Sequence, residues 1–223
     1  MIRKRLINAI DFSGNAYQDI KSCTYGREII KINDISGTQC YIGILPPFLR
    51  ITFRGTDSDA DWRLDMRFWK KRIPYDNKSS KIRVHSGFIN AYKSDDVRLK
   101  IHKYITDDIC NIQITGHSLG GALAVLCAVD LQYNFPEKDY EVVIFGCPRV
   151  GNAAFARSYN KRVFNTIRVE NGNDIVTKLP PAILGYRHVG VKFKIGNWSV
   201  PGVVSFKSHK IQRYYKNLIK RLY

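Results

Sequence analysis

One serine in this chain stands in a setting that turns a hydroxyl group into a nucleophile. Residues 114–121 read Ile-Thr-Gly-His-Ser-Leu-Gly-Gly, so that Ser118 lies between two glycines in the pattern G-x-S-x-G. A strand that turns sharply into a helix leaves no room for a Cβ beside the serine, which is why glycine suits both positions. The β-branched run before Gly116 favours a strand, and the apolar run after Ser118 favours a helix. We therefore expect the Ser118 hydroxyl to project from a turn, with the Leu119 N–H directed at a developing oxyanion.

A serine hydroxyl attacks well only when a histidine removes its proton and a carboxylate orients that histidine. For a serine on such a turn, the expected chain order is serine, then acid, then histidine. Two histidines follow Ser118, namely His188 and His209. The carboxylates between Ser118 and the second histidine are Asp130, Glu137, Asp139, Glu141, Glu170 and Asp174.

Asp174 and His209 are the preferred partners of the serine. Asp174 lies in a loop that follows an expected strand, and the carboxyl ends of strands deliver side chains to the crevice of a parallel sheet. His209 lies at the start of a basic terminal helix expected over 210–223, a position from which its side chain can reach the same crevice. Glu170, at the strand end, is the less favoured candidate for the acid, and His188, which follows Asp174 closely, is the less favoured candidate for the base.

The remaining titratable residues are expected to have structural roles. Asp130, in the helix after Ser118, and the three acids that follow it are interpreted as solvated charges. His85 and His117 precede the serine and are expected to support the turn. His102 lies in a helical pattern and is expected to be exposed.

The elements that must position these residues alternate along the chain. We expect a helix over 6–17, strands over 28–33, 40–45 and 49–53, a strand from 82 that turns at 85–88, a helix over 91–105, and strands over 140–145 and 163–169. Residues 62–68 alternate as a strand does but also fit one helical face. The pattern predicts an α/β fold in which a predominantly parallel sheet is flanked by helices, with residues 1–223 as a single domain.

Bulk composition restricts the classes of protein that remain. The chain is 44% hydrophobic and 25% charged, which is ordinary for a soluble globular protein, and its longest apolar run, near 123–129, is too short to span a bilayer. No apolar segment of signal-peptide length precedes Asp11. The compartment is not assigned, although these features favour a cytoplasmic or peripheral membrane location.

The cysteines indicate a reducing environment. Five are present, an odd number without framework spacing, and three of them, Cys110, Cys127 and Cys147, stand in apolar segments. We expect free thiols, with these three packed as small core residues.

Several ordered motifs together resemble one known family, the class 3 lipases, which include fungal triacylglycerol lipases and plant enzymes of the phospholipase A1 type. The resemblance runs from about Leu49 to His209 with order and spacing preserved. The matching segments are Phe53-Arg54-Gly55-Thr56, Val84-His85-Ser86-Gly87-Phe88, Thr115 to Ala122, Phe145 to Asn152, Asp174-Ile175-Val176, Leu179-Pro180-Pro181 and Tyr186 to Gly190.

This resemblance implies an α/β-hydrolase fold and a role for each site residue. Ser118 would be the nucleophile, Asp174 the acid and His209 the base. The backbone N–H groups of Thr56 and Leu119 would form the oxyanion hole. The reaction would be ester hydrolysis through an acyl-enzyme, which needs neither a metal ion nor an organic cofactor.

The choice of ester is left open by two conflicting features. Fungal members carry an amphipathic lid, whereas the corresponding stretch 57–62 is short and acidic here, with Trp62 as its one large apolar residue and candidate substrate contact. That stretch favours small, soluble esters, as in feruloyl esterases of the same fold. The net charge of +17 instead favours a polyanionic partner such as an anionic membrane surface.

Three functions therefore remain in order of preference. The first is hydrolysis of lipid esters, either acylglycerols or phospholipids, and the second is a soluble short-chain carboxylesterase. The third is a non-catalytic module that binds anionic lipid. Nucleic acid is disfavoured as a partner because no zinc-finger spacing, RNP-like aromatic signature or basic heptad helix is present. The sequence does not set the oligomeric state.

Overall fold

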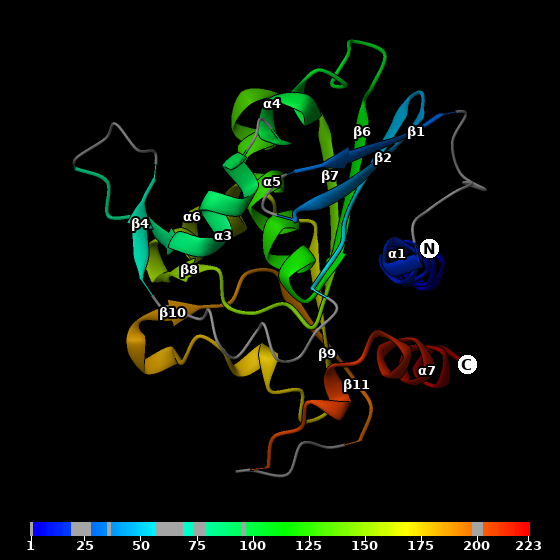
Figure 1. Cartoon of the computed structure of the whole chain (residues 1–223), viewed down its shortest axis with the longest axis vertical. Coiled ribbons are helices and arrows are strands. Elements are labelled where there is room, and N and C mark those ends of the chain that lie inside the picture. Colours follow the sequence, from blue (N-terminus) through cyan, green and yellow to red (C-terminus); the bar gives the residue numbers. More distant parts are fainter. Residues whose placement is uncertain are drawn as a thin grey trace.

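The main sheet of the molecule has seven strands. The computed structural model describes residues 2–18, 28–34, 37–56, 69–73, 79–94, 97–197 and 203–223. In spatial order the strands are β1 (Glu28–Asn33), β2 (Gln39–Leu45), β3 (Phe48–Phe53), β6 (Asn111–His117), β7 (Asp139–Phe145), β9 (Thr166–Asn171) and β11 (Val191–Ile195). The first three pair antiparallel, and β3 through β11 pair parallel (Figure 1). The predicted, mostly parallel sheet is confirmed.

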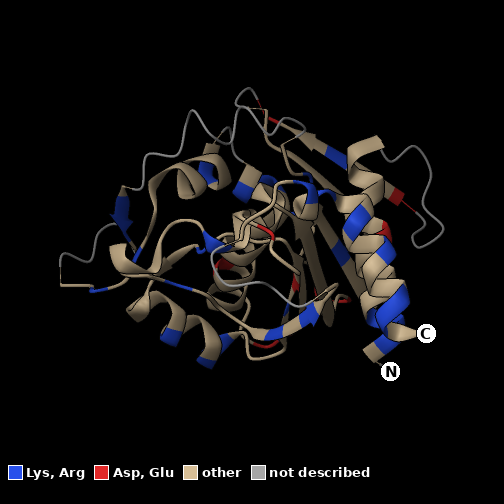
Figure 2. Ribbon diagram, turned by 90° about the horizontal axis from the view of Figure 1, so that it is seen from below, with Lys and Arg blue, Asp and Glu red and all other residues tan. Residues whose placement is uncertain are grey.

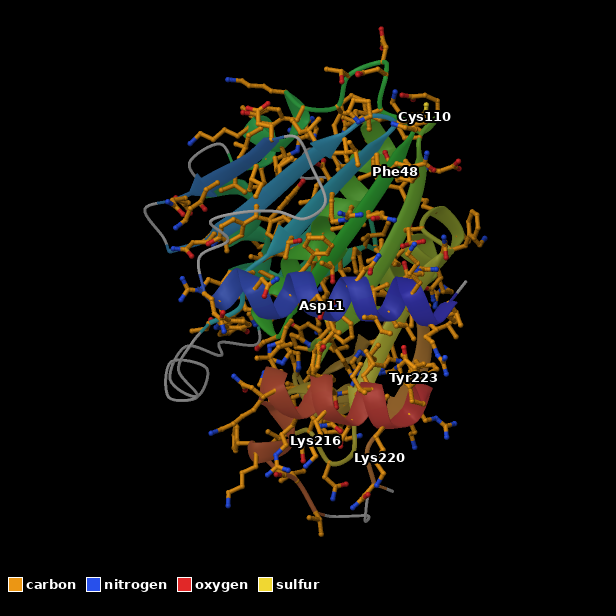
Figure 3. The ribbon with its side chains drawn as sticks, turned by 90° about the vertical axis from the view of Figure 1, so that its right-hand side faces the viewer. Asp11, Phe48, Cys110, Lys216, Lys220 and Tyr223 are labelled. Carbon is orange, nitrogen blue, oxygen red and sulfur yellow. The ribbon has the colours of Figure 1, made fainter. Side chains whose placement is uncertain are left out.

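Helices cover both faces of this sheet. On one face lie α3 (Ser86–Lys93), α4 (Val97–His102), α5 (Leu119–Asn134) and α6 (Ala153–Arg162). On the other face, α1 (Ile2–Asn15) and α7 (Ile211–Leu222) run side by side (Figures 1 and 3). The first part of helix α5, residues 119–128, is apolar all round, as suits a helix enclosed between the sheet and its neighbouring helices.

Two hydrophobic clusters hold these layers together. The larger one joins α3, α5 and α6 to the sheet, and the smaller one joins α1 and α7 to β7, β9 and β11. In α7 the buried residues Tyr214 and Leu218 are four positions apart, so they share one helical face. The basic side chains of this helix are left on its outer side.

A second, antiparallel sheet was not predicted. It consists of β10 (Tyr186–Arg187), β8 (Gly151–Asn152), β5 (Arg83–His85) and β4 (Lys70–Arg72), in that order. Strands of two or three residues are too short to show a hydrophobic period. The short 3-10 turns are η1 (Ala16–Gln18), η3 (Val176–Lys178), η4 (Ala182–Leu184) and η5 (Lys207–His209).

The other predicted elements agree with the structure apart from their boundaries. The expected helix over 91–105 is two helices, because α3 starts at Ser86 and α4 starts at Val97. The expected strand over 163–169 is displaced toward the C-terminus, as β9. Residues 62–68 lie outside the described part of the chain. No helix of the described residues is long and apolar enough to cross a membrane.

Of the cysteines within the described residues, all four are free thiols, as expected. Cys127 and Cys147 are buried, but the expectation that Cys110 is a core residue is wrong, because its side chain is exposed just before β6. The buried position next to it in the sequence is Ile109. Cys110 lies one residue before β6 begins, so the burial of Ile112 and Ile114 on alternate positions of that strand does not extend to it.

Candidate active site

Ser118 occupies a strained turn between β6 and α5. Its φ of 59° and ψ of −127° lie where side chains are rarely found, at a cost of about 1–3 kcal/mol. A Cβ at Gly116 would overlap the Gly120 carbonyl, and one at Gly120 would overlap the Phe53 carbonyl. The two motif glycines therefore allow the turn to close, and they let α5 begin directly against the loop that leaves β3.

Three side chains form a continuous hydrogen-bonded chain at this turn. The Ser118 Oγ lies 2.8 Å from Nε2 of His209, and Nδ1 of His209 lies 2.8 Å from Oδ2 of Asp174. Because the carboxylate only accepts, Nδ1 of the histidine carries the proton, and Nε2 is left to accept from the serine. The arrangement can thus move a proton from the serine to the imidazole. All three side chains are buried.

The Asp174 carboxylate is held by donors from two further elements. It receives a hydrogen bond of 2.9 Å from the Val176 N–H and one of 2.6 Å from the Tyr214 hydroxyl. Burying a carboxylate is costly unless its oxygens are hydrogen-bonded in this way. Burial, and then the Asp174 charge, raise the pKa of Tyr214 well above its ordinary value, so the phenol stays protonated and keeps donating.

The histidine backbone is fixed by the amide of Asn171, at the end of β9. The Asn171 Nδ2 donates to the Ser208 carbonyl at 2.8 Å, which anchors η5 immediately before His209. The Asn171 N–H donates to the Tyr214 hydroxyl at 3.2 Å. One residue thus connects the strand that delivers the acid to the turn that delivers the base.

His117, which was expected to support the turn, contacts the base His209. Its ring stacks on the His209 ring with centroids 4.6 Å apart, and its Nε2 donates to the His209 carbonyl at 2.8 Å. Its Nδ1 accepts from the Tyr17 hydroxyl at 2.8 Å. Burial, and then the nearby His209, lower the pKa of His117 well below 6.5, so it stays neutral beside an imidazole that must gain charge.

Gly146, directly after β7, leaves room for the acid and the base. Its φ is +55°, and a Cβ there would lie 2.9 Å from Cε1 of His209 and 3.1 Å from Oδ2 of Asp174. Glycine is needed at this position for both reasons. The glycine of the motif Phe-Gly-Cys-Pro-Arg therefore leaves room for the side chains of Asp174 and His209.

The two residues expected to form an oxyanion hole lie on segments that pack together. The Leu119 N–H is the first of α5, so no carbonyl within the helix accepts its hydrogen. Thr56 ends the described segment that leaves β3, and the preceding Gly55 lies against the His117 carbonyl. Trp62, the candidate substrate contact, lies outside the described residues together with the rest of the acidic stretch.

Glu170 and His188, the less favoured candidates for the triad, lie near each other rather than near Ser118. His188 Nε2 lies 3.7 Å from Oε1 of Glu170, and the same carboxylate pairs with Arg168 and with Lys192. Burial, as the largest cause, lowers the pKa of His188 to about 3. Arg168, Glu170 and Lys192 therefore form a separate charge cluster on β9 and β11, with a neutral His188 beside it.

Three other expectations are wrong. Asp130 is not a solvated charge, because Arg98, His102 and Tyr92 all donate to its carboxylate. His102 is consequently largely covered rather than exposed. His85 does not contact the turn; its Nδ1 accepts from two N–H groups at the start of α3, at 3.1 and 3.4 Å. Burial lowers the pKa of His85 to about 4.

Tyr17, Asn171 and Tyr214 support the site but were not identified from the sequence. Tyr17 lies in η1, directly after α1, and is 100 positions from His117, while Tyr214 lies in α7 and is 40 positions from Asp174. The one available signal was the apolar stripe of the terminal helix, in which Tyr214 stands at a buried position. Within the described residues, no cluster of His, Cys, Asp or Glu is arranged to hold a metal ion.

A mostly parallel sheet with a serine at a strand-to-helix turn defines the α/β-hydrolase fold. A sequence match gives the family: residues 50–184, more than half of the chain, match the lipase (class 3) family, and the chain belongs to it.

Relatives of known structure or activity fall in the same group. The chain is 34% identical to the chloroplastic phospholipase A1 of Arabidopsis thaliana, over 61% of this chain and 34% of that protein. It is 34% identical to a lipase of Rhizomucor miehei, over 65% of this chain and 41% of the lipase. A solved triacylglycerol lipase, in which a serine protease triad forms the catalytic centre, superposes with a TM-score of 0.72 and 28% identity, covering 86% and 79% of the two chains. The chain thus spans well under half of the two curated relatives.

Proposed function

We propose that this protein hydrolyses the carboxylic esters of lipids through an acyl-enzyme on Ser118. The observation that carries the proposal is the pair of 2.8 Å contacts joining Ser118 to His209 and His209 to Asp174. Membership of the class 3 lipase family supports the same chemistry. A fully assembled, buried triad has no purpose in a protein that only binds lipid.

In the first half of the reaction, Nε2 of His209 takes the Ser118 proton while Oγ attacks the ester carbonyl. Asp174 stabilises the imidazolium that forms. The N–H groups of Leu119 and Thr56 donate hydrogen bonds to the carbonyl oxygen and stabilise its developing negative charge. Removing one such donor typically costs about 10²–10³ in rate. The tetrahedral species collapses, His209 returns its proton to the leaving alcohol, and the acyl group stays on Ser118.

Water completes the cycle. His209 removes a proton from a water molecule, whose oxygen attacks the acyl carbonyl. The second tetrahedral species breaks its bond to Oγ, Ser118 recovers its proton from His209, and the fatty acid leaves. No step needs an electron acceptor, a metal ion or an organic cofactor.

Lipid esters are the proposed substrate class, as either acylglycerols or phospholipids. The relatives named as a phospholipase A1 and as lipases support this choice. A soluble short-chain carboxylesterase is the second candidate, favoured by the acidic composition of residues 57–61. The location, cytoplasmic or at a membrane periphery, stays a prediction, as does the single domain over residues 1–223.

An anionic lipid surface is the proposed docking partner. After Asp174 the chain contains no further acid, while its basic residues are Lys178, Arg187, Lys192, Lys194, Lys207, Lys210, Arg213, Lys216, Lys220 and Arg221. Figure 2 views the molecule from the side on which the parallel strands end. In this view α7, which ends at the C-terminus, carries basic residues and no acidic residue. Basic side chains near an anionic membrane contribute about 1 kcal/mol each.

Hydrolysis of p-nitrophenyl esters with increasing acyl length tests the proposed activity. We expect turnover that rises toward long chains and is abolished in Ser118→Ala, whose melting temperature should match the wild type. A preference for the shortest esters would favour the carboxylesterase. No turnover at any length, in a folded protein that still binds anionic vesicles, would favour the binding module and overturn the proposal.

A further inference from the structure

A polar pocket lies on the outer side of the loop that carries Asp174. Its volume is about 270 Å³, and it is lined by the end of β9, by residues 197, 205, 207 and 208, and by the first turns of α7. Every lining residue is polar or glycine, and the described lining contains two cations, Lys207 and Arg213, but no carboxylate. The lining amides belong to Asn171, Asn173, Asn197 and Asn217. The pocket therefore carries a net positive charge and many N–H donors.

The charges of this pocket are not used elsewhere in the described structure. Neither Lys207 nor Arg213 pairs with a carboxylate of the described residues, and the chain has no acid after Asp174 that could neutralise them locally. Two of the amides, in contrast, are already committed, because Asn217 Nδ2 donates to Asn171 Oδ1 at 2.7 Å. One wall is thus internally bonded, while the cations and the amides of Asn173 and Asn197 have no side-chain partner within the described part of the chain and can contact a ligand.

We propose that this pocket binds a phosphate group, and that the phosphate belongs to the head group of an anionic lipid at the surface where the enzyme works. A guanidinium presents paired N–H donors that match phosphate oxygens, and an ammonium adds a point charge. A metal ion has no carboxylate ligand here, and a pocket lined by polar residues and glycine does not suit an acyl chain. The lipid part of the proposal rests on the proposed function.

The pocket shares its wall with the catalytic residues. Asn173 immediately precedes Asp174, and Ser208 immediately precedes His209. Asn171, which lines the pocket, donates to the Ser208 carbonyl at 2.8 Å. A lipid phosphate held here would keep the plane of the head groups at the edge of the catalytic crevice, so that binding favours productive docking of a neighbouring ester.

The first experiment uses inorganic phosphate as the probe on the full chain, measured by calorimetry at constant ionic strength against chloride. The pocket variant is Lys207→Ala with Arg213→Ala. The matched control is Lys216→Ala with Lys220→Ala, which removes the same charge from α7 outside the pocket (Figure 3). We expect the control to bind as the wild type does and the pocket variant to lose at least about tenfold in affinity. No binding by the wild type, or equal losses in both variants, would overturn the site.

Asn197→Asp provides a second variant, because it places a carboxylate in the pocket with almost no change in size. It should also weaken phosphate binding while its melting temperature stays near that of the wild type. Unchanged affinity in this variant would contradict the placement of the ligand. None of these measurements depends on hydrolysis, so they stand even if the proposed activity fails.

The second experiment separates lipid phosphate from free phosphate. An ester substrate is presented in phosphatidylcholine vesicles that contain either phosphatidic acid or the same charge of cholesteryl hemisuccinate, a carboxylate. We expect phosphatidic acid to lower KM several-fold more than the carboxylate does, with kcat unchanged, and we expect the pocket variant to lose that difference. If phosphate binds in solution but the two vesicles behave alike, the lipid source is overturned.

Discussion

At the scale of single residues, the site depends on groups that never touch a substrate. Tyr214 belongs to a terminal helix on the far face of the sheet, yet its hydroxyl is the 2.6 Å donor to the Asp174 carboxylate. Gly146 contributes only the absence of a side chain. The triad is therefore positioned by residues whose roles depend on the folded structure.

Tyr214→Phe should lower kcat with little effect on KM. The change removes one hydrogen bond to a charged group, worth about 1.5–3 kcal/mol, so we expect a loss of about tenfold to a hundredfold. The measurement is steady-state hydrolysis of a p-nitrophenyl ester. The neighbouring Tyr215 is half-exposed, and Tyr215→Phe serves as the control that should stay at wild-type activity. Equal effects of the two changes would contradict the assigned position.

Gly146→Ala should lose activity far more than stability. The new Cβ would crowd the His209 ring, and misplacing a catalytic group by about 1 Å can cost about 10²-fold in rate. Gly37→Ala is the matched control, because Gly37 also has a positive φ, of 81°, but nothing lies within 4 Å of the added Cβ. Both variants should lose about 1–2 kcal/mol of folding free energy, while kcat falls only in Gly146→Ala. Normal kcat in that variant would show that the space is not needed.

At the scale of elements, the amount of structure that the sequence predicts depends on the length of each periodic run. The β-branched run of β6 and the apolar run of α5 are long and unambiguous, so the turn at Ser118 was predictable in detail. The strands at 70–72, 83–85, 151–152 and 186–187 are too short to show a period, and the sheet that they form was missed.

The candidate triad was predictable because chain order leaves few partners for a serine on this turn. Its supporting contacts were not, because Tyr17 and Tyr214 reach the site only after α1 and α7 pack on the sheet. The role of His85 was missed for a related reason. The sequence places His85 just before a helix, but it does not show whether the side chain caps that helix or supports the turn at Ser118, because this depends on how the elements pack.

The cap on α3 predicts a contribution to acid sensitivity. In the folded protein the pKa of His85 is about 4, against 6.5 for an exposed histidine, because burial disfavours its charged form. Between these pH values the unfolded chain binds more protons, so stability falls as pH falls, by on the order of 3 kcal/mol at pH 4 from this group. His85→Asn keeps a side-chain acceptor at the cap without the titration.

Urea unfolding at pH 7, 5.5 and 4.5 checks this prediction. The loss of unfolding free energy on acidification should be smaller in His85→Asn than in the wild type. Parallel pH dependences in the two proteins would show that His85 does not contribute.

At the scale of the whole molecule, charge is distributed unevenly. Ser118 and Asp174 follow the carboxyl ends of two parallel strands, and His209 lies in η5. The chain after Asp174 contains ten basic residues and no acid. The molecule can therefore present a positive surface near its site while its core remains that of an ordinary α/β-hydrolase.

Docking on anionic vesicles should consequently weaken with salt. The Debye length falls from about 10 Å at 0.1 M to about 3 Å at 1 M, so we expect at least about a tenfold loss of vesicle affinity over this range. Sedimentation with vesicles of phosphatidylglycerol measures the affinity, and vesicles of phosphatidylcholine are the control. Binding that ignores both salt and lipid charge would rule out electrostatic docking.

The central claim is that Ser118 is the nucleophile and that His209 activates it. Labelling with a fluorophosphonate, followed by peptide mass spectrometry, tests it most directly. We predict one adduct per chain on the peptide that contains Ser118, at a rate reduced by at least about 10³-fold in His209→Ala. An adduct on another residue, or an unchanged rate of labelling in His209→Ala, would contradict the claim.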